Sequence, residues 1–294
     1  LEIINLSSYT EYEKLFIAKE HLIKLCLQDY KLTSDNIKFS DEIILKIIRN
    51  YTKEAGVREL DRVINKIIRR YVKDMLSKNL DTINTKVTDK KLEEYLGKIK
   101  YEDSSILDTP SYGVVNGLAY TKFGGEVLPI EVVTYESKEK FIATGNLGDV
   151  MMESAKIALG HIKSHAKDYK VDLEALDKVC IHINALDAAV PKDGPSAGCA
   201  LVTAIISSVT KRCVDKTYAM TGEISLTGKV LPIGGLKEKS IGAYRSGVKT
   251  IFIPKKNEHD VSDIPKEVKD NINIILVDDY KEIYDVIFKK SKKS

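Results

Sequence analysis

The first hundred residues carry apolar positions at the spacing of amphipathic helices. Apolar residues recur every three or four positions over 11–28 and again over 57–75, with charged residues between them. Ser40 is followed by two acidic residues and then by an isoleucine-rich stripe, which is typical of a helix N-cap and an acidic first turn. The pattern therefore predicts an all-α subdomain over residues 1–100.

The pattern changes over 101–112, where turn-forming residues interrupt the periodicity and indicate a domain boundary. Beyond it, short runs typical of strands alternate with helical stretches, which indicates an α/β domain over 101–294. The expected strands are 114–119, 127–133, 179–183, 251–254 and 274–277, and the expected helices are 147–166, 196–209 and 280–288.

The composition is that of a globular protein without a strong charge bias. The 294 residues are 43% hydrophobic and 30% charged. The 46 basic and 43 acidic residues leave a net charge of +3, so charge does not select nucleic acid or a membrane surface as a partner. No stretch of 18 apolar residues occurs, and we therefore expect no membrane insertion.

The loop from Val190 to Gly198 is the segment best suited to chemistry. It contains two prolines and two glycines and leads into a helix of small residues. Ser196 falls in the first turn of that helix, where backbone N–H groups lack a partner within the helix and the helix dipole is positive. Such donors can stabilise the oxyanion that forms in acyl transfer. Ser196 is therefore a candidate nucleophile.

Two other interpretations of Ser196 fit the sequence. Serine is a common N-cap with no chemical role, and a helix N-terminus can also bind phosphate. The phosphate-loop motif G-x-x-x-x-G-K-[ST] occurs nowhere, however, and the segment 235–240 has Glu238 where that motif needs glycine. The loop alone leaves catalysis and helix capping open.

A serine nucleophile needs a base, and the histidines offer no obvious one. Of the five, only His182 lies in a predicted strand that leads toward the Ser196 loop, and a histidine in a strand is more often a core residue. A lysine can serve if burial lowers its pKa from about 10.4 to about 7–8. Lys239 follows an apolar stretch and a Gly-Gly turn that would direct the start of a helix inward. The alternative is a solvated lysine beside Lys237 and Glu238.

The segments around these two residues resemble the Lon family of ATP-dependent serine proteases. The segment 191–198, PKDGPSAG, matches the nucleophile motif of that family without a mismatch. The segments 219–223 and 227–239 are similar to its second conserved block, and the spacing between Ser196 and Lys239 also fits.

The resemblance implies roles for several residues. It makes Ser196 the nucleophile and Lys239, rather than Lys237, the base of a catalytic dyad. Thr221 falls on a threonine that hydrogen-bonds the dyad in family members. Three residues before the nucleophile fall on the active-site loop of the family, where the acid is associated with active and inactive loop states: Asp193, Gly194 and Pro195.

In the first hundred residues, the segment 54–58 resembles the small helical subdomain, or lid, of the AAA+ module of the family. Arg58 matches its sensor-2 arginine, which reaches the γ-phosphate of ATP. The resemblance thus implies an all-α AAA+ lid followed by a Lon-type α/β protease domain. The Walker motifs are missing, so we expect no cofactor in this chain and ATP with Mg²⁺ in the full-length protein.

The function implied is that of an ATP-dependent serine endopeptidase that degrades unfolded, damaged or regulatory proteins. The expected partners are such substrates and identical subunits in a full-length homohexamer. The chain begins at Leu1 without an initiator methionine, so we expect it to be part of a longer protein and either peptidase-only or latent. Several segments look closest to mitochondrial members, which implies the mitochondrial matrix, with the bacterial cytoplasm as the alternative.

A non-enzymatic DNA-binding or assembly module with an idle site is the alternative function. Some Lon proteins bind DNA, and the helix predicted over 57–75 has basic residues Arg62, Arg69 and Arg70 on one face. Acidic residues are interleaved with them, which is typical of an ordinary solvated face.

The segment 182–190 departs from the family pattern. Asn184 stands where many relatives have a second histidine. Because this segment is expected to line the groove beside the nucleophile, the resemblance leaves the cleavage preference open.

Overall fold

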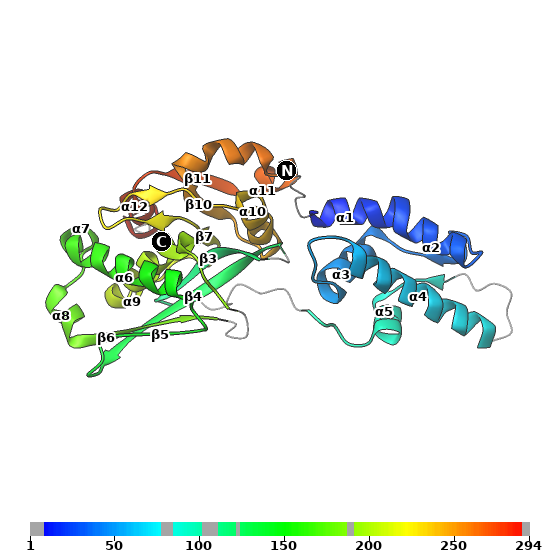
Figure 1. Ribbon diagram of the computed structural model, residues 1–294, viewed down its shortest axis with the longest axis horizontal. Helices are drawn as coiled ribbons and strands as arrows, with labels where there is room; N and C mark the ends of the chain where they lie inside the picture. Colours follow the sequence, from blue (N-terminus) through cyan, green and yellow to red (C-terminus); the bar gives the residue numbers. More distant parts are fainter. Residues whose placement is uncertain (1–8, 78–84, 102–110, 122–123, 187–190, 290–294) are drawn as a thin grey trace, which may run out of the picture. The chain divides into compact units, whose positions relative to one another are not determined.

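The computed structural model describes residues 9–77, 85–101, 111–121, 124–186 and 191–289. Its contacts divide the chain into two compact units, Leu1–Asp103 with Lys122–Gly124, and Ser104–Thr121 with Gly125–Ser294 (Figure 1). Most of the expected boundary segment, 101–112, lies outside the described residues. Each unit has its own hydrophobic core, so we describe the two separately.

The first unit is helical, as the apolar spacing predicts. Its elements are α1 (Glu11–Ile17), the π-helical turn η1 (Ala18–Leu22), α2 (Ile23–Asp29), α3 (Asp41–Tyr51), α4 (Arg58–Ser77) and α5 (Asp89–Leu96). Ser40 caps α3 as expected, because its side chain accepts a hydrogen bond from the backbone N–H of Ile43 at 3.3 Å. The isoleucine stripes of α3 and α4 are buried together. In addition to the helices, β1 (Ile37–Lys38) and β2 (Thr85–Lys86) form a short parallel pair.

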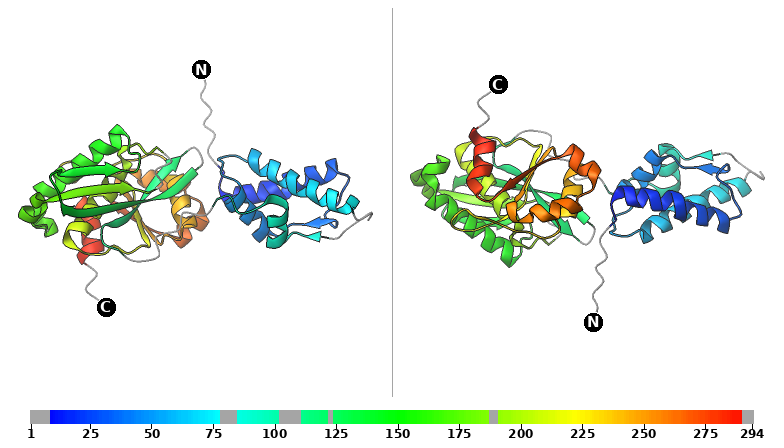
Figure 2. Two further views of the ribbon diagram at one scale, coloured as in Figure 1. Left: turned by 90° about the horizontal axis from the view of Figure 1, so that it is seen from below. Right: turned by 90° about the horizontal axis from the view of Figure 1, so that it is seen from above.

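The second unit is built on a mixed seven-stranded sheet in the order β11-β10-β7-β3-β4-β6-β5. The strands are β3 (Val114–Thr121), β4 (Gly124–Glu136), β5 (Phe141–Thr144), β6 (Val179–Ala185), β7 (Tyr218–Met220), β10 (Thr250–Pro254) and β11 (Asn273–Val277). β11, β10, β7 and β3 are parallel neighbours, whereas β4 is antiparallel to β6, and β5 joins β6 in parallel at the edge. Figure 2 shows the green strands β4, β5 and β6 side by side. All five expected strands are confirmed.

Helices pack on both faces of this sheet. Successive residues of β10 separate the two layers, because Phe252 joins a core with α6 (Asp149–Ser164) and α9 (Gly198–Thr210), whereas Ile251 and Ile253 join a core with α10 (Leu236–Arg245). The remaining elements are α7 (Ala166–Tyr169), α8 (Leu173–Lys178), η2 (Pro195–Ala197), β8 (Glu223–Ile224), β9 (Val230–Leu231), η3 (Lys255–Asp263), α11 (Lys266–Asn271), α12 (Tyr280–Tyr284) and η4 (Asp285–Lys289). The first eleven residues of α9 are all buried, as expected for a helix that is apolar on every side.

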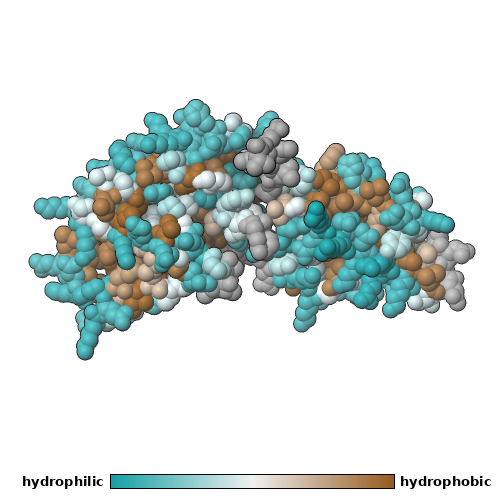
Figure 3. Space-filling model, viewed as in Figure 1, coloured by the Kyte–Doolittle hydropathy of each residue, from teal (hydrophilic) through white to brown (hydrophobic). Residues whose placement is uncertain are grey.

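The α10 layer covers only part of its face of the sheet. On β4, Val127 lies in the core with α10, but Val133 and Tyr135 on the same face of that strand are 54% and 41% exposed. The outward face of β4, β6 and β5 is therefore open to solvent. Figure 3 shows hydrophilic residues over much of the molecular face in view, and no helix in the described ranges is both long and apolar enough to cross a bilayer.

α10 packs on the start of β4 without an intervening side chain. A Cβ atom on Gly125 would lie 1.8 Å from the carbonyl oxygen of Glu238, and one on Gly242 would lie 2.4 Å from the carbonyl carbon of Gly125. Both contacts are backbone against backbone, so no side-chain rotation can relieve them. The two glycines therefore fix the position of α10, which carries Lys239.

We predict that Gly125→Ala destabilises the protein by about 2 kcal/mol or more, because the added methyl group forces α10 away from β4. The measurement is the urea unfolding midpoint. The matched control is Gly234→Ala in the turn before α10, where a Cβ atom meets nothing within 4 Å. Equal unfolding midpoints for the two variants would contradict the close contact.

Candidate active site

The Ser196 loop ends in a tight turn that the sequence supports locally. Gly194 has a φ of 131°, which only glycine adopts readily, and Pro195 begins the 3₁₀ turn η2 that leads into α9. Ser196 is half-buried in this turn, which confirms the expected position at the start of the helix. Among the described residues, its hydroxyl has no hydrogen-bond partner.

The segment after β7 holds this turn through its backbone. The N–H of Gly222 donates to the carbonyl oxygen of Ser196 at 2.8 Å, and the N–H of Cys199 donates to the carbonyl oxygen of Gly222 at 3.0 Å. The hydroxyl of Thr221 donates to the same Ser196 oxygen at 3.3 Å. A Cβ atom on Gly198 would lie 2.8 Å from the backbone nitrogen of Ile224, so this approach requires glycine. The Ser196 turn and the segment around Thr221 are thus held together by these hydrogen bonds and by close packing.

Lys239 extends from α10 to Thr221. Its side chain is only 3% exposed, and Nζ donates to the hydroxyl of Thr221 at 3.1 Å. Burial lowers the pKa of Lys239 to about 8, because removal from water penalises the ammonium form. No acidic side chain in the described part of the chain pairs with it. Thr221 therefore links two groups through hydrogen bonds. One is the backbone of Ser196, and the other is a buried amine that loses its proton readily.

The other candidate bases lie in different surroundings. Lys237 is half-exposed on the same helix, so α10 turns inward at Lys239 and not at Lys237. Both ring nitrogens of His182 are within 3.1 Å of hydroxyls, those of Tyr135 and Thr144 on the open face of the sheet. His182 is therefore not hydrogen-bonded to Ser196.

Asp193 ties the Ser196 loop to α6. One carboxylate oxygen accepts from the backbone N–H of Met151, in the first turn of α6, at 3.1 Å, and from the N–H of Gly194 at 3.0 Å. A Cβ atom on Gly148, the residue before α6, would lie 2.4 Å from the Asp193 carboxyl carbon. Gly148, the N-cap residue of α6, has no side chain, and the Asp193 carboxylate supplies the missing acceptor from a distant part of the sequence.

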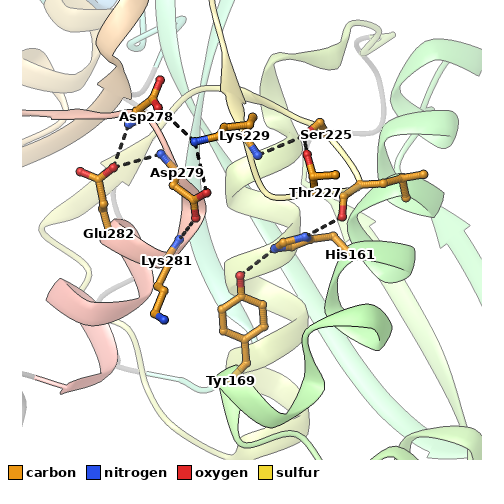
Figure 4. Close-up of polar contacts among 10 residues, drawn as sticks. His161, Tyr169, Ser225, Thr227, Lys229, Asp278, Asp279, Lys281 and Glu282 are labelled. Atoms are coloured by element: carbon orange, nitrogen blue, oxygen red, sulfur yellow. Dashed lines mark hydrogen bonds and ion pairs between the residues drawn. The ribbon is translucent and has the colours of Figure 1, made fainter.

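The hairpin of β8 and β9, which follows Gly222, is held by a polar network that the sequence pattern did not indicate (Figure 4). His161 lies between the carbonyl oxygen of Leu226 at 3.1 Å and the hydroxyl of Tyr169 at 2.7 Å. Burial lowers the pKa of His161, so the neutral ring donates to Leu226 and accepts from Tyr169. Lys229 Nζ pairs with Asp278 at 3.2 Å. These residues are far apart in the sequence, and no local motif relates them.

The described residues hold one expected part of a nucleotide site. Arg58, the expected sensor-2 residue, is exposed at the first position of α4. One exposed guanidinium does not form a nucleotide site by itself, so the described residues do not account for ATP binding. Within those residues, no group of three or more histidine, cysteine, aspartate or glutamate side chains is placed to hold a metal ion.

We predict that Lys239→Met increases the free energy of unfolding at pH 7 by about 2 kcal/mol. The folded pKa of about 8 lies below the unfolded value of about 10.4, so at pH 7 folding must bury a charged amine. Between these two pKa values the unfolded chain binds more protons, so the stability of the parent protein rises with pH and the gain from methionine shrinks.

Urea unfolding at pH 7 and at pH 9.5 measures both effects, with Lys237→Met as the control on the same helix. A Lys239→Met protein that is less stable than its parent at pH 7 would show that the burial cost is absent.

We further predict that Asp193→Ala lowers the free energy of unfolding by about 1 kcal/mol, because Met151 loses its acceptor. Asp193→Asn retains an acceptor and loses only the charge, so we expect a loss of about 0.5 kcal/mol. Thermal unfolding of the two variants tests this order. Identical stabilities for parent, Asn and Ala proteins would rule out a capping role.

Two family models match adjacent parts of the chain. The Lon protease AAA+ ATPase lid domain matches residues 28–87, and the Lon protease (S16) C-terminal proteolytic domain matches residues 86–290. The match to the proteolytic domain includes Ser196, Thr221 and Lys239.

Relatives named Lon protease match the whole chain. The protein of Mycoplasma mycoides subsp. mycoides is 49% identical over 293 residues, which cover 100% of this chain and 37% of the relative. That of Mycoplasma genitalium is 49% identical over 288 residues, 98% of this chain and 36% of the relative. Lon protease 1 of Bacillus subtilis is 43% identical over 293 residues, 100% of this chain and 38% of the relative.

The chain therefore spans little more than a third of the length of these relatives. They are bacterial proteins, so they do not support the expected mitochondrial setting and fit the bacterial alternative. Because both family models match and the relatives are more than 40% identical over the length of this chain, the chain belongs to the Lon protease family and contains its lid domain and its proteolytic domain.

Proposed function

We propose that the second unit is a serine peptidase in which Ser196 is the nucleophile and Lys239 is the base. The observation that carries this proposal is the buried Lys239 amine, which donates a hydrogen bond to the hydroxyl of Thr221. That hydroxyl donates in turn to the backbone carbonyl oxygen of Ser196. With a pKa of about 8, about half of the amine is neutral at pH 8, so it can accept a proton.

The reaction begins when neutral Lys239 takes the proton of the Ser196 hydroxyl as Oγ attacks the scissile carbonyl carbon. Backbone N–H groups of the turn at Ser196 stabilise the oxyanion, and Thr221 and Gly222 hold that turn in place. Collapse expels the amine product, which receives the proton from Lys239, and leaves an acyl-enzyme. Lys239 then takes a proton from water as the water oxygen attacks the ester carbonyl carbon, and it returns that proton to Oγ of Ser196 as the acid product leaves.

In the longer protein, we propose that this unit degrades unfolded, damaged or regulatory proteins in an ATP-dependent homohexamer of the bacterial cytoplasm. The name protease and the bacterial sources of the relatives support proteolysis in a bacterium, and the match to an AAA+ ATPase lid supports the dependence on ATP. Arg58 contributes to an ATP and Mg²⁺ site whose other parts lie outside this chain. We place the functional boundary near residue 100, after α5, because Leu92 and Tyr95 of α5 pack in the core of the first unit.

The DNA-binding alternative gains no comparable support. Arg62, Arg69 and Arg70 are exposed on α4, but exposed arginines among acidic residues are ordinary surface charges. The buried Lys239 amine is a feature that the catalytic function requires. The exposed arginines of α4 are ordinary for a solvated helix face and do not require DNA binding.

We predict that an acyl-serine-reactive inhibitor labels Ser196 in the full-length protein, and that Ser196→Ala abolishes both labelling and peptide hydrolysis. The rate of labelling and kcat/KM for a small peptide should rise with pH through about 8, because Lys239 must lose its proton. Lys239→Met should reduce kcat/KM by at least about a thousandfold, whereas Lys237→Met should retain it. Mass spectrometry locates the label, and hydrolysis that survives in Lys239→Met would exclude the proposed base.

A further inference from the structure

A pocket of about 330 Å³ opens on the uncovered face of β4, β6 and β5. It is lined by Glu131, Val133, Thr144, His182 and Asn184. None of these residues belongs to the Ser196, Thr221 and Lys239 arrangement. The pocket lies on the same face of the sheet as α10, beyond the part of β4 that α10 covers.

Strand register places three polar residues of the pocket in one row across the sheet. Glu131 of β4 is opposite Asn184 of β6, and Asn184 is opposite Thr144 of β5. His182 lies one row away, between Val133 and Ile142. The row is the last one facing outward before β5 and β6 end.

Hydrogen bonds in this row have one consistent direction. The hydroxyl of Thr144 lies 3.0 Å from Oδ1 of Asn184, and Nδ2 of Asn184 donates to Oε2 of Glu131 at 3.2 Å. The single proton of the Thr144 hydroxyl has two acceptors, Oδ1 of Asn184 at 3.0 Å and the carbonyl oxygen of Ile183 at 3.4 Å, and we assign it to the nearer. With either acceptor that proton is used, so we assign a proton to Nε2 of His182, which lies 3.1 Å from the hydroxyl. Every donor then points toward Glu131, and the chain of hydrogen bonds ends on its carboxylate.

The pocket therefore presents an anionic acceptor. Oε1 of Glu131 has no partner among the described residues, and no basic side chain in that part of the chain pairs with this carboxylate. Val133, 54% exposed, supplies an apolar wall beside it. A carboxylate at the end of an apolar wall suits the aliphatic stem and cationic head of lysine or arginine. The volume is sufficient for one such side chain.

The pocket also lies close to the Ser196 loop. Beyond Thr144, the carbonyl oxygen of Asn146 accepts from the N–H of Lys192 at 3.0 Å, and the N–H of Gly148 donates back to Lys192 at 2.7 Å. Lys192 precedes Ser196 by four residues, which span at most about 14 Å. Thr144 precedes Asn146 by two residues, so the path from the pocket to Ser196 is at most about 25 Å long. An extended peptide covers that length with about seven residues.

We propose that this pocket binds a lysine or arginine side chain of an extended substrate, within about seven residues of the bond that Ser196 cleaves. The proposal rests on the proposed peptidase function and adds a specificity site to it. Glu131 is the residue that determines the preference, and Asn184 and Thr144 orient its carboxylate.

The test uses the full-length protein and a set of peptides with one cleavage site, in which a lysine or a glutamine is moved through about seven positions on each side. We expect one position at which lysine raises kcat/KM about three- to tenfold over glutamine. Glu131→Gln retains an acceptor for Asn184 and should lower kcat/KM for the lysine peptide to that of the glutamine peptide. Glu131→Lys should make lysine unfavourable at that position. Glu136→Gln, at the end of the same strand, is the matched control.

Binding of the same peptides, followed by fluorescence anisotropy, separates this proposal from the proposed function. Glu131-dependent binding without hydrolysis would retain the pocket and overturn the peptidase. Hydrolysis without a lysine preference at any position, or with a preference that survives in Glu131→Gln, would overturn the pocket alone. If Glu131→Gln instead slows all peptides equally and changes the sedimentation coefficient, the pocket is a contact between subunits and the proposal is wrong.

Discussion

The candidate site depends on the burial of one amine. Lys239 is removed from water and has a hydroxyl, not a carboxylate, as its partner. A carboxylate in the place of Thr221 would stabilise the ammonium form and raise the pKa of the lysine, whereas a hydroxyl positions the amine without neutralising the effect of burial. The surrounding structure supports this condition, because α10, the segment after β7 and the Ser196 turn enclose the amine from different parts of the chain.

The fold could be predicted where apolar patterns are long enough. The helices of the first unit and strands β3, β4, β6, β10 and β11 follow from periodicity and short apolar runs. β5 and β7 have only four and three residues, and β1 and β2 have two each, so tertiary pairing and not local pattern determines them.

The site was predicted in part, and mainly through the family motifs. Ser196 at the start of a helix and Lys239 at an inward position agree with the structure, whereas periodicity alone left both open. The capping of α6 by Asp193 could not be foreseen, since its acceptor role depends on a backbone N–H more than forty residues away. The surroundings of His182 depend on register between three strands, which the sequence does not specify directly.

The contact between Gly125 and Gly242 has a consequence for the precision of the site. A helix seated on side chains can shift whenever those side chains change rotamer, but a helix seated on bare backbone has no such alternatives. The entropic cost of fixing the helix that carries the Lys239 amine therefore arises once, when the protein folds. It does not arise again in each catalytic cycle.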